Sequence, residues 1–125
     1  MMKNISVWKQ ELADGVHASR LAYLYCCTAA ETAAQAARYS ALLEGLENTF
    51  GAHTEAALYS APGRTEIGGN HTDHQHGHVL CGSVDLDMLA CAAANGLRVI
   101  RIFSEGYPAL EVDLDRLVPL SLIHI

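Results

Sequence analysis

Basic residues are scarce in this sequence. Eight Lys and Arg stand against 14 Asp and Glu, which gives a formal net charge of −6 at pH 7 with neutral histidines. A protein that binds nucleic acid needs a basic face to neutralise the phosphates. The charge balance therefore argues against nucleic acid as a partner.

Cysteines are also few, and their spacing is uninformative. The four residues are Cys26, Cys27, Cys81 and Cys91, with no C-x-x-C pair and no spaced metal-binding framework. Reduced, buried thiols are the expected state of such cysteines in a cytosolic protein.

Long apolar runs are absent. Charged residues interrupt the N-terminus from Lys3 to Asp14, so no apolar segment of a signal peptide is present there. The run from Leu21 to Cys27 is too short to cross a bilayer, and Glu31 interrupts the Ala-rich stretch that follows. We therefore expect a cytoplasmic protein that makes no membrane contact.

What the sequence does contain is enough apolar material for a core. Half of its 125 residues are apolar, which predicts one small folded domain over residues 1–125. Helical patterns come first, over 5–13 with Ser6 as a candidate cap, and over 28–48 with a capping box at Thr28 and Glu31. The second helix is predicted to place Tyr39, Leu42, Leu43 and Leu46 on one apolar face and to end at residues 48–51. Residues 16–27 fit a helix or a strand.

The periodicity then changes to that of strands. Strands are predicted over 56–61, 79–94, 97–104 and 109–114, which makes an α+β fold with N-terminal helices and a mostly antiparallel sheet. Asn95-Gly96 is a strong hairpin signal, so we expect the strands on either side of it to pair at the centre of the sheet. In the strand before it, Asp85 and Asp87 alternate with Val84, Leu86 and Met88, which predicts burial of the apolar face.

Residues 61–78, APGRTEIGGNHTDHQHGH, are the densest in reactive groups. They hold one Arg, one Glu, one Asp, one Asn and four His, with four Gly and one Pro between them. Glycines allow a close backbone approach and positive φ, and polar side chains on a loop between strands commonly bind ligands. We therefore expect residues 61–78 to form a binding loop.

This stretch resembles the galactokinase signature and, more broadly, the N-terminal motif of the GHMP sugar and metabolite kinases. Ala61-Pro62-Gly63-Arg64 matches the family pattern directly, and Gly69 and His71-Thr72-Asp73 match in register. Asn70 stands where the family has Glu, and His74 where it has Tyr. The resemblance extends more loosely to about residue 115 and implies the N-terminal part of a GHMP-kinase-like domain.

The resemblance also implies roles. Arg64 would stabilise the transition state of phosphoryl transfer from ATP, with Mg²⁺, to the anomeric hydroxyl of galactose. Sugar hydroxyls would be bound by Asn70, His71, Thr72 and Asp73. Ser104 would lie near the nucleotide. Carboxylate, amide and imidazole groups suit this task because sugar hydroxyls both donate and accept hydrogen bonds.

Other interpretations stay open at this point. Arg64 could form a surface ion pair with Glu66, His71 could be a buried structural histidine, and Ser104 could cap a turn at the end of a strand. The changes at Asn70 and His74 leave the identity of the sugar open and admit a sugar sensor without catalytic activity. A third alternative is a metal-binding module, because an extended chain would place His74, His76 and His78 on one side.

The end of the sequence is abrupt. The family carries a Gly/Ser-rich phosphate loop and a catalytic aspartate downstream of this signature, and no such glycine-rich run occurs in these 125 residues. The resemblance therefore predicts a truncated N-terminal portion of a kinase that is inactive by itself, with a foreign tail over residues 120–125 as one explanation of the ending. The oligomeric state is not predicted.

Overall fold

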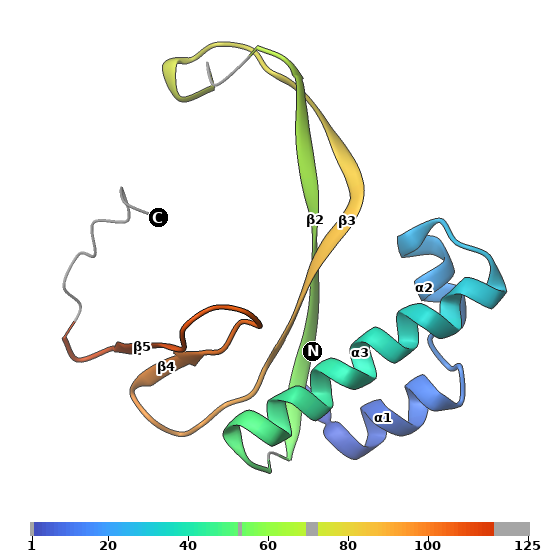
Figure 1. Cartoon of the computed structure of the whole chain (residues 1–125), viewed down its shortest axis with the longest axis vertical. Coiled ribbons are helices and arrows are strands. Elements are labelled where there is room, and N and C mark those ends of the chain that lie inside the picture. The colour runs from blue at the N-terminus through green and yellow to red at the C-terminus, as the bar shows by residue number, and fades with distance from the viewer. Residues whose placement is uncertain (1, 53, 70–72, 117–125) are drawn as a thin grey trace. The chain divides into compact units, whose positions relative to one another are not determined.

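The computed structural model describes residues 2–52, 54–69 and 73–116 of the chain (Figure 1). It divides into two compact units, Met1–Ala93 and Ala94–Ile125, which are treated separately below. The order of elements confirms the predicted α+β class, with helices first and antiparallel strands after them. The prediction of a single domain over residues 1–125 stays a prediction.

The first unit opens with a short strand and three helices. These are β1 (Lys3–Asn4), α1 (Ile5–Ala13), α2 (Ala18–Tyr25) and α3 (Ala29–Phe50). The predicted first helix is confirmed, but its cap is the Asn4 side chain, which accepts from the Ser6 backbone N–H at 2.9 Å. Residues 16–27, which fitted either a helix or a strand, contain helix α2. None of the helices within the described ranges is long and apolar enough to span a lipid bilayer.

Helix α3 begins and ends where the sequence indicates. Thr28 and Glu31 form the predicted capping box, with the Thr28 backbone N–H donating to the Glu31 carboxylate at 2.7 Å. The hydrogen bond from the Thr28 backbone N–H is the main cause of a lowered pKa for Glu31, and the bond from the Thr28 hydroxyl lowers this pKa further. Gly51 ends the helix with φ of +83°, a conformation that glycine adopts without a steric penalty.

The sheet of this unit consists of three antiparallel strands. Strands β2 (Glu55–Gly68) and β3 (Leu80–Ala92) form a long pair, and β1 adds to the edge of β2. The single-turn 3-10 helix η1 (Asp73–Gln75) lies between β2 and β3 in the sequence. The helices lie beside one part of the β2–β3 pair, which continues beyond them (Figure 1).

The core of the unit lies between the helices and the start of β2. Leu43 of α3 is completely buried, and the cluster around it contains Ile5, Leu12, Leu21, Tyr39, Leu46 and Ala56. The Trp8 indole N–H donates to the Ala56 carbonyl at 3.0 Å, which ties α1 to β2. This packing confirms the predicted apolar face of α3.

Replacing Leu43 with alanine is expected to destabilise the chain by about 2–5 kcal/mol, because the change removes buried methyl groups and leaves a cavity. Urea unfolding followed by circular dichroism measures this. Leu24→Ala in α2 is the matched control, since Leu24 is 53% exposed and its truncation should cost only about 0.5 kcal/mol. Equal losses for the two variants would contradict this assignment of the core.

The second unit contains one antiparallel pair, β4 (Val99–Ile102) with β5 (Leu110–Asp113). Gly106, with φ of +80°, lies in the turn between these two strands. The hairpin predicted at Asn95-Gly96 is wrong, because β3 pairs with β2 and β4 with β5. The Asn95 side chain instead accepts from the Leu97 N–H and donates to the Val99 carbonyl, so the dipeptide makes a local Asx turn.

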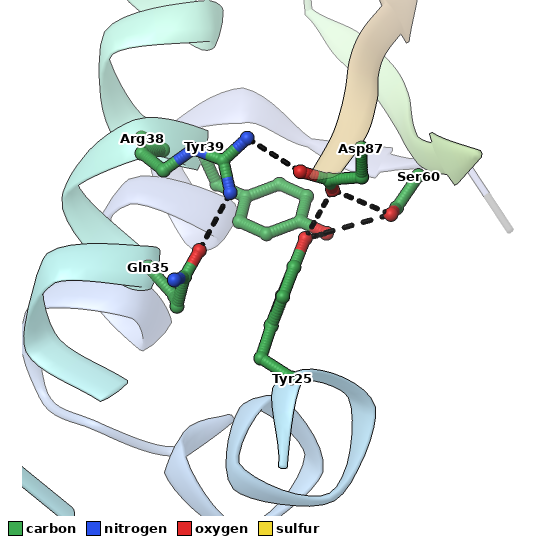
Figure 2. Close-up of polar contacts among 6 residues, drawn as sticks. All are labelled: Tyr25, Gln35, Arg38, Tyr39, Ser60 and Asp87. Atoms are coloured by element: carbon green, nitrogen blue, oxygen red, sulfur yellow. Dashed lines mark hydrogen bonds and ion pairs between the residues drawn. The ribbon is translucent and has the colours of Figure 1, made fainter. Parts of the chain in front are cut away.

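The predicted facing of β3 is also wrong in part. Leu86 and Met88 are 77% and 75% exposed, whereas the Asp87 side chain is only 9% exposed and lies against the helices. Asp87 can face the helices because Tyr25, Arg38 and Ser60 donate hydrogen bonds to its carboxylate (Figure 2). A carboxylate can occupy an inward position when its oxygens are fully hydrogen-bonded.

Candidate functional site

The chemically dense stretch is mostly strand rather than loop. Residues 61–68 belong to β2 and pair with β3, so the predicted loop begins only after Gly68. The prediction failed because the strand here is formed by pairing with β3, whereas Gly63 and Gly68 in the sequence suggest a loop. Arg64 is thus held by a backbone ladder.

Two glycines of the stretch are required by close contacts. A Cβ at Gly63 would lie 2.9 Å from the Val84 Cγ2 atom of β3. A Cβ at Gly69 would lie 2.5 Å from the His78 carbonyl oxygen, and the φ of Gly69 is +102°. Only glycine fits the backbone conformation and the space at Gly69, where the chain leaves β2.

Arg64 lies on a defined face of the β2–β3 pair. It is directly opposite Ser83, and Glu66 is opposite Cys81, so these four side chains share one face. Arg64 is exposed, and within the described part of the chain its guanidinium has no ion pair or hydrogen bond. The alternative of an Arg64–Glu66 ion pair is therefore not formed.

The predicted sugar contacts are only partly visible. Asn70, His71 and Thr72 lie outside the described residues, whereas Asp73 is the first residue of η1. Gly69 and Asp73 therefore bracket the segment at the end of the strand that carries Arg64. The roles of Asn70, His71, Thr72 and Asp73 stay predictions.

The histidine run does not have the geometry that the metal-binding alternative needs. His74 lies in the 3-10 helix η1 and His76 has a φ of +62°, so the chain is not extended there. Spacing by two therefore does not place His74, His76 and His78 on one side. Among residues 2–52, 54–69 and 73–116, no group of three or more His, Cys, Asp or Glu could hold a metal ion.

Ser104 follows β4 in the second unit. Its carbonyl oxygen accepts from the Tyr107 backbone N–H at 3.1 Å, so it takes part in the turn between β4 and β5. This fits the alternative of a serine at a turn. Its role near a nucleotide stays a prediction.

Comparison with known proteins identifies the segment that carries this geometry. Residues 45–94 match the galactokinase galactose-binding signature. The matched residues run from the last part of α3 through β2, η1 and β3, so they contain Arg64, Gly69 and Asp73. The resemblance found in the sequence is thereby confirmed.

Curated relatives give the same result. The galactokinase of Lactococcus lactis subsp. lactis is 33% identical over 79 residues, which are 61% of this chain and 20% of that protein. The galactokinase of Streptococcus suis is 34% identical over 80 residues, 62% of this chain and 20% of that protein. That of Lacticaseibacillus casei is 30% identical over 69 residues, 55% of this chain and 18% of that protein.

The chain thus spans about a fifth of the length of the galactokinases that it matches. No solved structure matches it significantly.

Sequence reasoning missed the residues across the ladder from the signature. Ser83 and Cys81 share the face of Arg64, and Asp87 bonds the helices, yet none of them was a predicted site residue. Strand alternation divides β3 into two faces, but it does not reveal the pairing register. A pairing register is a long-range property that one strand's pattern does not encode.

Proposed function

We propose that this chain is the N-terminal, galactose-binding portion of a galactokinase. The parent enzyme transfers the terminal phosphoryl group of ATP to the anomeric hydroxyl of galactose and forms galactose 1-phosphate. The observation that carries the proposal is the match of residues 45–94 to the galactose-binding signature, which includes Arg64 on the β2–β3 pair. We place this reaction in the cytoplasm, as the composition predicts.

In this proposal the sugar lies against the end of β2. Asn70, His71, Thr72 and Asp73 contact its hydroxyls, and the Asp73 carboxylate accepts from two of them and orients the ring. The backbone fits this role because Gly69 turns the chain out of the strand immediately before these residues. The amide at Asn70 keeps an acceptor but carries no charge, so sugar binding here relies on Asp73 for its negative charge.

Arg64 has the character that phosphoryl transfer needs. The reaction depends on positioning and on stabilising the charge that spreads over the phosphoryl oxygens. A guanidinium is permanently charged and presents a planar fork of donors that matches phosphate oxygens. In this proposal the parent enzyme uses ATP with Mg²⁺. Ser104 contacts the nucleotide in that enzyme.

Neither alternative gains support. The metal-binding module lacks an extended histidine run. A sugar sensor without catalytic activity is not favoured by the comparisons, because the curated relatives at 30–34% identity are named galactokinases.

Asp73→Ala is expected to weaken galactose binding by about tenfold or more, because it leaves sugar hydroxyls without their acceptor and costs about 1–3 kcal/mol. Isothermal titration calorimetry of galactose with the chain and with the variant measures this. Asp115→Ala, a change of the same kind on an exposed residue of the second unit, should leave the affinity unchanged. Equal affinity of the chain and the Asp73→Ala variant would contradict the assigned contact.

A further inference from the structure

The Asp87 carboxylate lies at the centre of a polar cluster that joins four elements (Figure 2). Its Oδ2 atom accepts from the Tyr25 hydroxyl of α2 at 2.7 Å and from the Ser60 hydroxyl of β2 at 2.7 Å. Its Oδ1 atom accepts from Arg38 Nη2 of α3 at 2.6 Å. The cluster therefore bonds both strands of the β2–β3 pair to two helices.

The partners of Asp87 are themselves held in place. Arg38 also donates to the Gln35 side chain at 2.7 Å, and its guanidinium lies 5.8 Å from the centre of the Tyr25 ring. The Tyr25 and Tyr39 hydroxyls are 2.8 Å apart. Networks in which each member has a partner are rigid and select one arrangement of the elements that they join.

The cluster lies close to Arg64 along the β2–β3 pair. Asp87 is opposite Pro62 in the ladder, and Ser60 is four residues before Arg64. Pro62 has no N–H, so its backbone cannot donate a hydrogen bond at this pair. The hydrogen bond from Ser60 to Asp87 links the two strands through their side chains beside this pair.

The pairing register shifts directly after this pair. Between Pro62 and Arg64 there is one residue on β2, whereas between Asp87 and Ser83 there are three on β3. Such a bulge redirects the side chains that follow it. The direction in which Arg64 points therefore depends on keeping this irregular pairing.

We propose that Asp87 is a positioning residue for Arg64, because its carboxylate fixes the register of β2 and β3 at the last pair before the bulge. The importance of Arg64 rests on the proposed function, but the effect of Asp87 on the strands can be measured without it. A hairpin of two strands is marginally stable by itself, so an anchor to the helices has a large influence on its pairing.

The charge of Asp87 is part of the mechanism. Burial by itself would raise the pKa of Asp87, but the hydrogen bonds from Tyr25, Arg38 and Ser60 outweigh it and hold that pKa below its usual value. Burial raises the pKa of the Tyr25 hydroxyl, with further contributions from Tyr39 and Asp87, so Tyr25 stays a neutral donor. The groups that bond Asp87 are thus one cation and two hydroxyls.

The direction of the pH effect follows from this lowered pKa. A carboxylate with a lower pKa in the folded chain contributes its full stabilisation above the ordinary carboxyl pKa of about 3.9. The contribution is lost as the pH falls through the lower value of the folded state. Protection of the strand segment should therefore decrease below about pH 4.

Amide hydrogen exchange measured by NMR on the whole chain tests the proposal. In Asp87→Asn, the amides of residues 61–66, which exclude Pro62 because it has no N–H, should exchange about tenfold faster or more at pH 7, relative to the amide of Leu43, because bonds to a charged group are lost. The Leu43 amide reports opening of the core. The decrease in protection below pH 4, after correction for intrinsic exchange rates, should also disappear in this variant.

Glu47→Gln is the matched control. It makes the same carboxylate-to-amide change in the same unit and removes the Lys9–Glu47 ion pair between α1 and α3. Because this pair is partly exposed, the exchange of residues 61–66 should change by less than about threefold. If Asp87→Asn fails to fold, Tyr25→Phe removes one donor and keeps the ring, and should accelerate the same amides about threefold or more.

The outcomes are distinct. Faster exchange confined to residues 61–66, together with loss of the pH profile, supports positioning. An equal acceleration of residues 61–66 and Leu43, or no change beyond that of Glu47→Gln, would overturn it. A galactose titration of the unaltered chain separately tests the proposed function, so its failure would leave the exchange result standing.

Discussion

In the full-length enzyme to which we assign this chain, Arg64→Ala is expected to lower kcat and kcat/KM by similar factors of about 10²–10³. This loss is estimated by analogy with the removal of one oxyanion-hole donor. Arg64 would act mainly in the transition state, where charge is spread over the oxygens of the moving phosphoryl group. The KM for galactose should therefore change little.

Steady-state kinetics with galactose and ATP both varied measures this effect. Arg64→Lys should restore only part of the rate, since a point charge does not reproduce the guanidinium fork. Asp73→Ala should differ by chiefly raising the KM for galactose, although a poorly held sugar also lowers kcat. Arg101→Ala is the matched control, because Arg101 is an exposed residue that pairs with Glu111 in the second unit.

An increase in the galactose KM alone for Arg64→Ala, with kcat intact, would contradict the role of Arg64 in the chemical step. It would instead place Arg64 among the sugar contacts. The Arg64 and Asp73 variants change different elements, because Arg64 lies in β2 and Asp73 lies in η1, after the strand has ended.

The second large effect concerns the 125-residue chain itself, which we expect to have no kinase activity. It has candidate sugar contacts but no Gly/Ser-rich run to hold phosphates. Phosphoryl transfer depends on positioning and electrostatic stabilisation together, and a site with half of its parts loses both. Adding galactose should therefore produce no ADP from ATP.

A coupled assay of ADP formation with the purified chain measures this, and a curated galactokinase such as that of Lactococcus lactis serves as the positive control. Galactose-dependent turnover that is lost in the Arg64→Ala variant would refute the prediction. Turnover that persists in this variant would point to a contaminating kinase.

The helices could be predicted from the sequence because their signals are local. The capping box at Thr28, the apolar stripe of α3 and the terminal Gly51 all lie within one helix and act at short range. The signature was likewise readable, because Arg64, Gly69 and Asp73 stand at fixed offsets in one run.

The pairing of the strands could not be predicted, because it depends on contacts between distant residues. Asn95-Gly96 has the composition of a hairpin turn, but β3 finds its partner in β2, which precedes it in the chain, and the Asn95 side chain closes a local turn instead. Similarly, alternation alone assigned Asp87 to solvent. Its inward position depends on Tyr25 and Arg38, which come from two helices.

The most direct test of the central claim is an NMR titration of the unaltered chain with galactose, with glucose as the control sugar. The claim that residues 45–94 form a galactose-binding segment predicts saturable shifts at the amides of Arg64, Gly69 and Asp73, and weaker effects with glucose. The amides of the second unit, such as that of Ile100, should not move. Absence of saturable shifts with galactose, or identical shifts with glucose, would contradict it.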